Sequence, residues 1–390
     1  MNKHLISLVA GEPSGDLIAA QIVKGIHQAK PEANFFGIGG PALQAQGMHL
    51  NYPMDALSVF GYVDALKSLP KLIQVYSGIK KQIIKQQPGV FIGVDAPDFN
   101  LRLEHSLKQK GIKTVHFVSP SIWAWRYERI HKIRQAVDHM LVLFPFEVDI
   151  YQKEGIPVTF VGHPLANKIP FEPDQQEARQ RLKLPTDAKI LAILPGSRTS
   201  EIKHLAPVFL QTAQKLQAQE PDLHFIVPLV NQARKQQFLE IAANCKLKHL
   251  HLFDTPSVDQ PVSWDVMQAC DAALLSSGTA TLEMALFKKP MVIAYILTPL
   301  MLKIMTWKAG QDRPSVPWIG LPNILLQEFA VPEYLQEDVE PEGLSQACLK
   351  ALEDEAYRQT LMQKFQALHQ TLALDTGRIA AQKIIEVIES

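Results

Sequence analysis

The 390-residue sequence has no net charge and only three cysteines. Its 39 lysines and arginines balance 39 aspartates and glutamates, with no basic block or acidic tail. This balance argues against nucleic acid as the main partner, because surfaces that bind nucleic acid are strongly basic. The cysteines, Cys245, Cys270 and Cys348, lack the spacing of metal ligands, so we expect buried thiols in a reducing compartment.

Long apolar runs are also missing from the chain. The longest, residues 291–307, contains Pro299 and Lys303 and is too short for a membrane-spanning helix. The apolar residues 5–10 lack the flanks of a signal peptide and are expected to form the first strand. We therefore expect a cytoplasmic protein that touches a membrane at most by its surface.

Short apolar segments alternate with helical patterns along most of the chain. In the first half they occupy residues 5–10, 34–38, 90–95, 113–118, 140–144 and 158–162. After a polar, proline-bearing linker at 170–187, further strands are expected at 189–194, 224–229, 249–253, 272–276 and 291–296. Such alternation predicts an α/β protein with parallel sheets covered on both faces. We expect two Rossmann-like domains, at residues 1–168 and 188–350, with C-terminal helices at about 360–390 joining the first.

Residues 272–296 predict a strand, a turn, a helix, a second turn and a strand. The first turn carries the cap-type residues Ser277, Gly278 and Thr279. In α/β sheets such a turn lies where ligands bind, and the free N–H groups of the helix favour a phosphate. Glu283, expected in the first turn of the helix, either hydrogen-bonds the hydroxyls of a ligand or only complements the helix dipole.

A similar strand-to-helix turn opens the second domain at residues 191–201, LAILPGSRTSE. It places Arg198 where a guanidinium can bind a phosphate bidentately, although a surface salt bridge is the alternative. Together, the turns with Arg198 and Glu283 suit a nucleoside diphosphate and its ribose.

Two carboxylates follow a strand in residues 90–100, VFIGVDAPDFN. Asp95 is expected to brace the turn, and Asp98 is the freer of the two. A carboxylate at a ligand-binding edge can accept a proton from a hydroxyl nucleophile, whereas a cap or Asx-turn is the alternative role. Because no metal-ligand pattern appears, we expect arginine and helix dipoles, without a metal ion or other cofactor, to stabilise a leaving phosphate.

Two apolar segments are candidates for contact with an apolar ligand or a membrane. Residues 56–69 carry Val59 and Phe60, and residues 300–307, LMLKIMTW, carry Met301 and Ile304. Amphipathic segments with basic edges bind anionic membranes, but an ordinary core helix has the same pattern.

The motifs taken together resemble the lipid-A-disaccharide synthase family. The matching stretches are AGEPSGD, VDAPDFN, VSPSIWAWR, PFE, FVGHPL, LPGSR, SSGTATLE, GLPNIL and VPEYLQ, in the order of the family. The resemblance implies a GT-B glycosyltransferase whose two Rossmann-like domains face each other across a cleft. It further implies transfer of 2,3-diacylglucosamine from its UDP conjugate to 2,3-diacylglucosamine 1-phosphate.

The resemblance also assigns roles to individual residues. Asp98 would be the general base of an inverting displacement, Arg198 would contact the diphosphate, and Glu283 would bind the ribose. The UDP-sugar site would be completed by Ser277, Gly278, Thr279, Asn323 and Gln336. The sequence departs from the family at Gln327 and Glu328, where some members carry a basic residue.

The resemblance implies a metal-independent protein, peripheral to the cytoplasmic face of the inner membrane, and a homodimer that exchanges C-terminal parts.

Two alternative functions remain open at this point. One is another GT-B enzyme on a UDP-sugar, such as an N-acetylglucosaminyltransferase or a 2-epimerase. The other is a module that binds nucleotide-sugars without catalysis.

Overall fold

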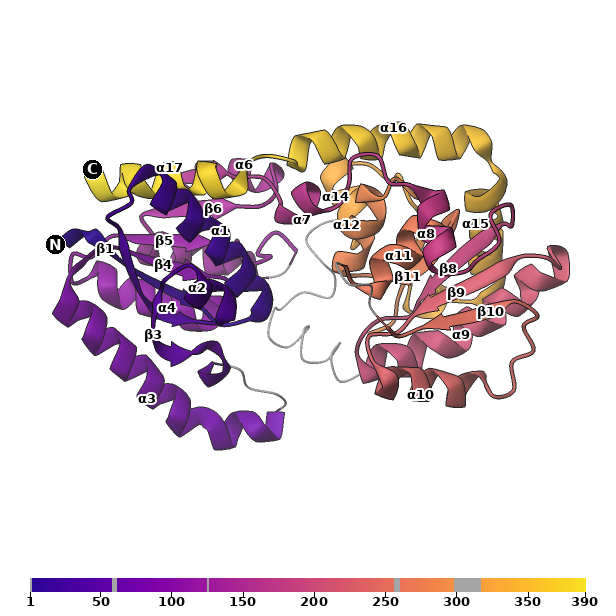
Figure 1. Cartoon of the computed structure of the whole chain (residues 1–390), viewed down its shortest axis with the longest axis horizontal. Coiled ribbons are helices and arrows are strands. Elements are labelled where there is room, and N and C mark those ends of the chain that lie inside the picture. Colours follow the sequence, from indigo (N-terminus) through magenta and orange to yellow (C-terminus); the bar gives the residue numbers. More distant parts are fainter. Residues whose placement is uncertain (1, 58–61, 125, 256–259, 298–316) are drawn as a thin grey trace. The chain divides into compact units, whose positions relative to one another are not determined.

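The computed structural model describes residues 2–57, 62–124, 126–255, 260–297 and 317–390. The chain forms two compact units (Figure 1). The first consists of Met1–Asn167 and Leu372–Ser390, and the second of Lys168–Thr371. In the described ranges, no helix has the length and apolar character needed to cross a membrane.

The first unit contains a parallel sheet of seven strands in the order β3-β2-β1-β4-β5-β6-β7. The strands are β1 (Asn2–Ala10), β2 (Asn34–Gly39), β3 (His49–Pro53), β4 (Pro88–Val94), β5 (Thr114–Phe117), β6 (His139–Val142) and β7 (Val158–Phe160). The helices are α1 (Pro13–Ala29), α2 (Pro41–Ala45), α3 (Tyr62–Gln86), α4 (Pro97–Lys108), α5 (Ile130–Ala136), α6 (Phe146–Lys153), α7 (Pro164–Lys168) and α17 (Thr376–Glu389).

Helices cover both faces of this sheet. On one face, α1 and α17 pack on apolar side chains of β1, β4 and β5. On the other, α3 and α4 pack on Phe91, Val9 and their neighbours. All seven residues of β4 are buried, as expected for a central strand of a parallel sheet.

The last helix, α17, lies beside α1 although it is distant in sequence (Figure 1). A Cβ at Gly25 would lie 2.5 Å from the carbonyl oxygen of Gly377, so glycine permits this close helix contact. The preceding helix, α16 (Glu355–Leu372), belongs to the second unit except for its last residue. The chain thus returns to the first unit at Leu372.

The second unit contains a parallel sheet of six strands in the order β10-β9-β8-β11-β12-β13. The strands are β8 (Ile190–Leu194), β9 (His224–Pro228), β10 (Leu250–Phe253), β11 (Ala272–Ser276), β12 (Met291–Tyr295) and β13 (Glu333–Leu335). The remaining helices are α8 (Gln175–Arg181), α9 (Thr199–Gln219), α10 (Gln232–Ala242), α11 (Val262–Ala269), α12 (Thr279–Leu286), α14 (Leu321–Leu326) and α15 (Pro341–Glu353).

Residues 170–187, interpreted above as a linker, are not an unstructured connection. They contain α8, whose N-cap residue Asp174 accepts a hydrogen bond from the Glu177 backbone N–H at 2.9 Å. Arg179 on this helix is buried, which ties the segment to the second unit. The polar composition of the segment concealed a helix that hydrogen-bonds to the chain just before β11, through Gln175 to the Cys270 carbonyl and Arg179 to the Ala269 carbonyl.

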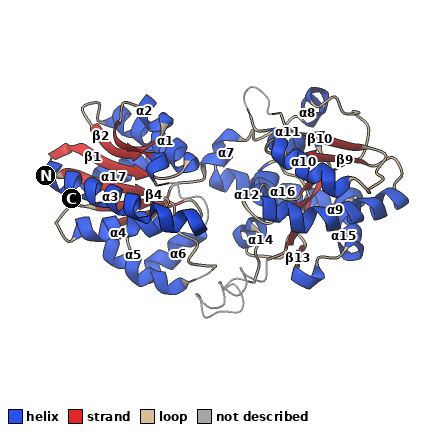
Figure 2. Ribbon diagram, turned by 90° about the horizontal axis from the view of Figure 1, so that it is seen from below, coloured by secondary structure: helices blue, strands red, loops and turns tan. Residues whose placement is uncertain are grey.

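The predicted fold class is confirmed by these two units. Each is an α/β unit with a parallel sheet and helices on both faces, as Figure 2 shows. In each sheet the chain first builds strands on one side and then returns to add strands on the other. The reversal falls between β1 and β4 in the first unit, and between β8 and β11 in the second. Ligands of open α/β sheets bind at the carboxyl ends of the strands beside such a reversal.

Candidate functional site

The predicted nucleotide-binding residues of the second unit gather at the carboxyl edge of its sheet. Arg198 follows β8, and Ser277 follows β11, the strand that pairs with β8. Gln336 follows β13, the neighbour of β12. The two turns predicted to bind a diphosphate therefore flank the point where the strand order reverses.

The turn after β8 is shaped by Glu201, which the sequence analysis did not single out. One carboxylate oxygen of Glu201 accepts hydrogen bonds from the backbone N–H groups of Ser197 and Arg198, at 2.9 and 3.0 Å. Gly196 has a φ of +113°, and a Cβ there would lie 2.4 Å from the same oxygen. An acidic residue at the third position of a helix commonly folds back in this way, and that signal was present in the sequence.

Arg198 is available to an anion from solvent. Its side chain is 79% exposed and pairs with Glu201 across 2.7 Å. An exposed pair of this kind contributes little to stability, so a phosphate can compete for the guanidinium. The salt bridge considered as the alternative role of Arg198 is therefore present. Because it is exposed and weak, it is compatible with the predicted binding of a phosphate by the same side chain.

The turn after β11 begins α12 without the side-chain cap that the sequence predicted. Gly278 is the N-cap residue, with a φ of +154° and no capping hydrogen bond from a side chain. Ser277 instead donates its hydroxyl to the carbonyl of Ile319 at 3.3 Å. Apart from the neighbouring residues of the chain, no described atom lies within 4 Å of the position of a Cβ on Gly278, so a ligand can approach the backbone of Gly278 and Thr279 closely.

Glu283 lies further along α12 than expected, because the first turn of this helix has no acidic residue. Its carboxyl group is half-buried, and burial raises its pKa, although a hydrogen bond from the Trp264 side chain opposes that effect. This position argues against the alternative that Glu283 only complements the helix dipole, because the effect of the dipole is confined to the first turn. A partly buried carboxyl that already accepts one hydrogen bond is suited to accept another from a hydroxyl.

Asn323 is fully buried and uses its whole hydrogen-bonding capacity within the protein. Its amide nitrogen donates to the carbonyl of Val331 at 2.8 Å and to Glu333 at 2.7 Å, and its oxygen accepts from the N–H groups of Ala330 and Val331. The side-chain amide therefore has no donor or acceptor left for a ligand. The Asn323 side chain thus holds the connection from α14 to β13, and a contact of this residue with the nucleotide stays a prediction.

Gln336 links the ends of two neighbouring strands. It has a φ of +51°, and its side-chain oxygen accepts a hydrogen bond from the Leu297 backbone N–H at 2.7 Å. This bond fixes the chain that leaves β12 against the turn that follows β13. Gln336 therefore lies on the same edge of the sheet as Arg198 and Ser277.

In the first unit, Asp98 is presented by a turn with unusual backbone geometry. Asp95 and Ala96 both lie in the left-handed region, with φ of +51° and +43°. The amide of the buried Asn100 donates to the carbonyls of Val9, Val94 and Asp95 at 3.3, 3.2 and 2.8 Å. Asn100 thus fixes the ends of β1 and β4 together and holds the turn, because left-handed non-glycine residues need such support.

Asp98 itself is not the cap of α4. The N-cap residue is Ala96, and no side chain caps this helix. Asp98 lies in the first turn of α4 with its side chain 86% exposed, and it accepts a hydrogen bond from Arg129 at 2.9 Å. The structure therefore presents a carboxylate to solvent at the edge where β1 and β4 meet.

The glycine-bearing turn after β1 proves to be structural in part. Asp16 is buried and accepts hydrogen bonds from the N–H groups of Gly40, Ala42 and Leu43, at 2.7, 2.8 and 3.3 Å. It thereby caps the start of α2. Gly11 lies against the Asp98 turn, since a Cβ there would be 3.4 Å from that of Ala96.

A group of buried aromatic and polar side chains supports the ends of β5, β6 and β7. Glu147 accepts a hydrogen bond from the Phe144 N–H at 3.1 Å, and burial raises its pKa to about 7 despite hydrogen bonds with Ser119 and Trp123. Trp123 is half-buried and meets the Phe146 ring edge-on. His163 stacks on Phe144, and burial lowers its pKa to about 4.

The residues predicted to contact the lipid acceptor or the membrane, Val59, Phe60, Met301 and Ile304, lie outside the described residues. Across the described ranges, no group of three or more histidine, cysteine, aspartate or glutamate side chains is arranged to hold a metal ion.

Comparison with known proteins decides the family. A family model described as lipid-A-disaccharide synthetase matches residues 6–384. A lipid-A-disaccharide synthase of Bordetella avium is 56% identical over 386 residues, covering 98% of each chain. Another from Chromobacterium violaceum is 44% identical over 382 residues, covering 98% of this chain and 97% of the other. The chain belongs to the lipid-A-disaccharide synthase family. It is a glycosyltransferase, and the family predicted from its motifs is confirmed.

Solved structures show a wider distribution of the same fold. A UDP-GlcNAc 2-epimerase from Neisseria meningitidis, bound to UDP-GlcNAc, matches with a TM-score of 0.63 at 12% identity over 99% of each chain. WaaG, a glycosyltransferase involved in lipopolysaccharide biosynthesis, matches with a TM-score of 0.57 at 12% identity over 98% of this chain and 99% of the other. These likenesses show a GT-B fold shared by transferases and epimerases. Sequence identity to the synthases argues against the epimerase alternative.

Proposed function

We propose that this enzyme transfers 2,3-diacylglucosamine from its UDP conjugate to the 6-hydroxyl of 2,3-diacylglucosamine 1-phosphate. The products are UDP and the β-1,6-linked lipid A disaccharide 1-phosphate. The observation that carries the proposal is the exposed Asp98 carboxylate on the β1–β4 edge, in a chain that belongs to the synthase family. The turns after β8 and β11, which are predicted to bind a diphosphate, support a UDP-sugar as the donor.

In the proposed mechanism, Asp98 accepts the proton of the 6-hydroxyl as the oxygen attacks the anomeric carbon of the donor. The bond from that carbon to the diphosphate oxygen breaks, and UDP leaves with the electron pair. Attack from the face opposite the leaving group inverts the anomeric configuration. Arg198 and the backbone N–H groups at the start of α12 stabilise the negative charge that develops on the diphosphate. No cofactor takes part.

Glu283 is proposed to hold the ribose of UDP. We expect Glu283→Ala to weaken the binding of UDP and of the UDP-sugar by about tenfold or more, because a hydrogen bond to a charged group is lost. Calorimetric titration with UDP and the KM for the donor measure this effect. Glu240→Ala, which removes an exposed carboxylate from α10, serves as the control. An unchanged donor KM in Glu283→Ala would return Glu283 to a structural role.

We further propose that the enzyme associates peripherally with the cytoplasmic face of the inner membrane. The apolar segments that carry Val59 and Phe60, and Met301 and Ile304, support this proposal by their composition. Replacing Met301 and Ile304 with serine is expected to reduce co-sedimentation with anionic liposomes. Leu239→Ser, at an exposed leucine of α10, is the matched control. Equal sedimentation of both variants would contradict the proposal.

The homodimer implied by the resemblance stays a proposal as well. An exchange of C-terminal parts would place α17 on α1 of the partner, where here it covers α1 of its own chain. Light scattering coupled to size-exclusion chromatography measures the oligomeric state.

The decisive test of the reaction is a turnover assay with both lipid substrates in mixed micelles, with a chelator present. Stoichiometric UDP and a tetraacyl disaccharide phosphate are the expected products. Release of UDP without disaccharide would indicate hydrolysis or a different acceptor. Binding of UDP without any product would revive the binding-only alternative.

A further inference from the structure

The two side chains of the ion pair between Arg129 and Asp98 differ in their exposure to solvent. The Arg129 side chain is 20% exposed, whereas that of Asp98 is 86% exposed. One N–H of the guanidinium, on Nη2, donates to one oxygen of Asp98 at 2.9 Å. Arginine offers five N–H donors in a rigid, planar fork. Within the described residues no second acceptor is found for this fork, so it can take another anion.

A second arginine lies one turn earlier on the same segment. Arg126 precedes the 3-10 turn η2 (Tyr127–Arg129), which leads directly into α5. Its Nε is buried without a hydrogen-bond acceptor in the described part of the chain, and it forms an ion pair with the Glu128 carboxylate across 3.5 Å. Two guanidinium groups with unused donors therefore belong to one short segment.

The start of this segment is anchored to the unit's core. The Ser119 hydroxyl lies 2.7 Å from the hydroxyl of the buried Tyr151, and Ser119 and Trp123 both hydrogen-bond the buried Glu147. These contacts fix the chain that leaves the carboxyl end of β5. Because β5 pairs with β4, the segment follows the strand next to the one that leads into the Asp98 turn.

We propose that Arg129, assisted by Arg126, binds the phosphate monoester of the acceptor, and that this phosphate displaces Asp98 from the Arg129 guanidinium. A phosphate monoester carries more negative charge than a carboxylate and binds arginine bidentately. Phosphate binding thereby releases the Asp98 carboxylate to accept the proton of the acceptor hydroxyl. The inference rests on the proposed function, and it links recognition of the acceptor phosphate to the freeing of the base.

The test compares 2,3-diacylglucosamine 1-phosphate with its dephosphorylated counterpart as acceptors, in neutral detergent micelles. Wild-type enzyme is expected to prefer the phosphorylated acceptor. Arg129→Ala is expected to raise the KM for that acceptor by about ten- to a hundredfold and to abolish the preference. Arg129→Lys keeps the charge but lacks the planar guanidinium, so it should give an intermediate KM for the phosphorylated acceptor. This variant also serves as a control for a folding defect in Arg129→Ala. Lys132→Ala removes an exposed charge from α5 and should keep the wild-type preference.

Other outcomes overturn the phosphate site. An equal fall in kcat for both acceptors, with KM unchanged, would leave Arg129 as a positioning residue for Asp98 alone. Loss of binding to phosphatidylglycerol vesicles in Arg129→Ala, with acceptor preference retained, would identify a membrane headgroup as the occupant. If wild-type enzyme turns over neither acceptor, the proposed function fails. Titration with glucosamine 1-phosphate then tests the proposed phosphate site independently of turnover. Equal affinity of wild type and Arg129→Ala for this compound would overturn the phosphate site.

Discussion

Asp98→Ala is expected to lower kcat by about a hundredfold to ten-thousandfold, the usual contribution of a general base. The affinity for UDP should stay near that of the wild type, because the residues proposed to bind UDP belong to the other unit. Asp98→Asn is expected to show the same loss. It keeps an acceptor for Arg129 but cannot take up the proton of the hydroxyl. Single-turnover kinetics and calorimetric titration with UDP measure the two quantities.

The matched control for this prediction is Asp149→Ala, an exposed aspartate in the first turn of α6. It removes the same charge from another helix of the first unit, and it should leave kcat unchanged. If Asp98→Ala weakened UDP binding as much as it slowed turnover, the carboxylate would have a structural role. Turnover of Asp98→Asn at the wild-type rate would exclude it as the base.

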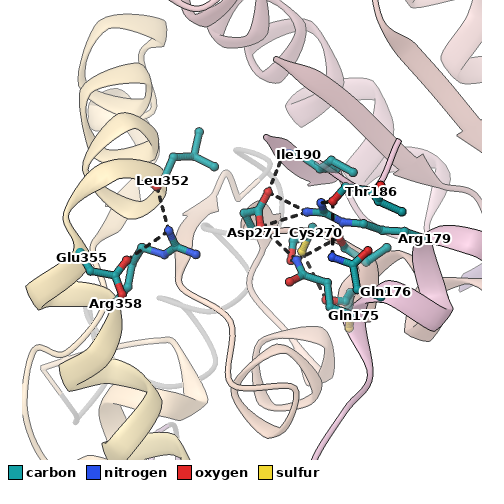
Figure 3. Close-up of polar contacts among 12 residues, drawn as sticks. Gln175, Gln176, Arg179, Thr186, Ile190, Cys270, Asp271, Leu352, Glu355 and Arg358 are labelled. Carbon is teal, nitrogen blue, oxygen red and sulfur yellow. Dashed lines mark hydrogen bonds and ion pairs between the residues drawn. The ribbon is translucent and has the colours of Figure 1, made fainter. Parts of the chain in front are cut away.

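Arg179→Ala is expected to lower the free energy of unfolding of the second unit by about 3–5 kcal/mol. The Arg179 side chain is only 4% exposed, and it donates to both oxygens of Asp271, at 3.0 and 2.9 Å (Figure 3). It also donates to the carbonyls of Ala269 and Thr186. Asp271 in turn accepts from the Ile190 N–H at 2.8 Å, so the network joins α8 to the starts of β8 and β11. Removing the arginine leaves a largely buried carboxylate without its cation.

Hydrogen exchange measured strand by strand tests this effect, with the sheet of the first unit as an internal reference. Faster exchange is expected in β8 and β11. Arg358→Ala is the control, because Arg358 is more exposed, pairs with Glu355 at 3.6 Å and makes one bond to a carbonyl, that of Leu352 at 3.2 Å (Figure 3). Its loss should cost less than about 1 kcal/mol. Equal protection in Arg179→Ala and wild type would show that the network contributes no net stability.

The strands that the sequence missed share a physical property. The expected strands were continuous apolar runs, and β4 and β11 are indeed buried at every residue. In contrast, β3 and β13 are edge strands of partly exposed residues, and β13 spans only Glu333–Leu335. Edge strands need not be apolar on both faces, so hydrophobic patterning gives a weak signal for them.

The sequence likewise indicated some residues of the candidate site and not others. Local patterns singled out Arg198 and Glu283, because a strand end followed by a helix start is visible in the sequence. They indicated Asp98 only weakly, and its proposed role came from the resemblance to the family. The partners of these residues were not visible. Arg129 reaches Asp98 from the segment before α5, and Asn100 reaches from α4 to the end of β1. The amide of Asn323 is saturated by the loop that precedes β13.

The sequence by itself determined the alternation of strands and helices, the α/β class, and the motifs that resemble the synthase family. These depend on hydrophobic period, turn residues and local order, which are properties of neighbouring residues. Only the tertiary structure decided the strand order, the reversals beside which the Asp98 and Arg198 turns lie, and the return of α17 to the first unit. Those features depend on hydrogen bonds and packing between residues far apart in the chain, and no local pattern encodes which distant segments will meet.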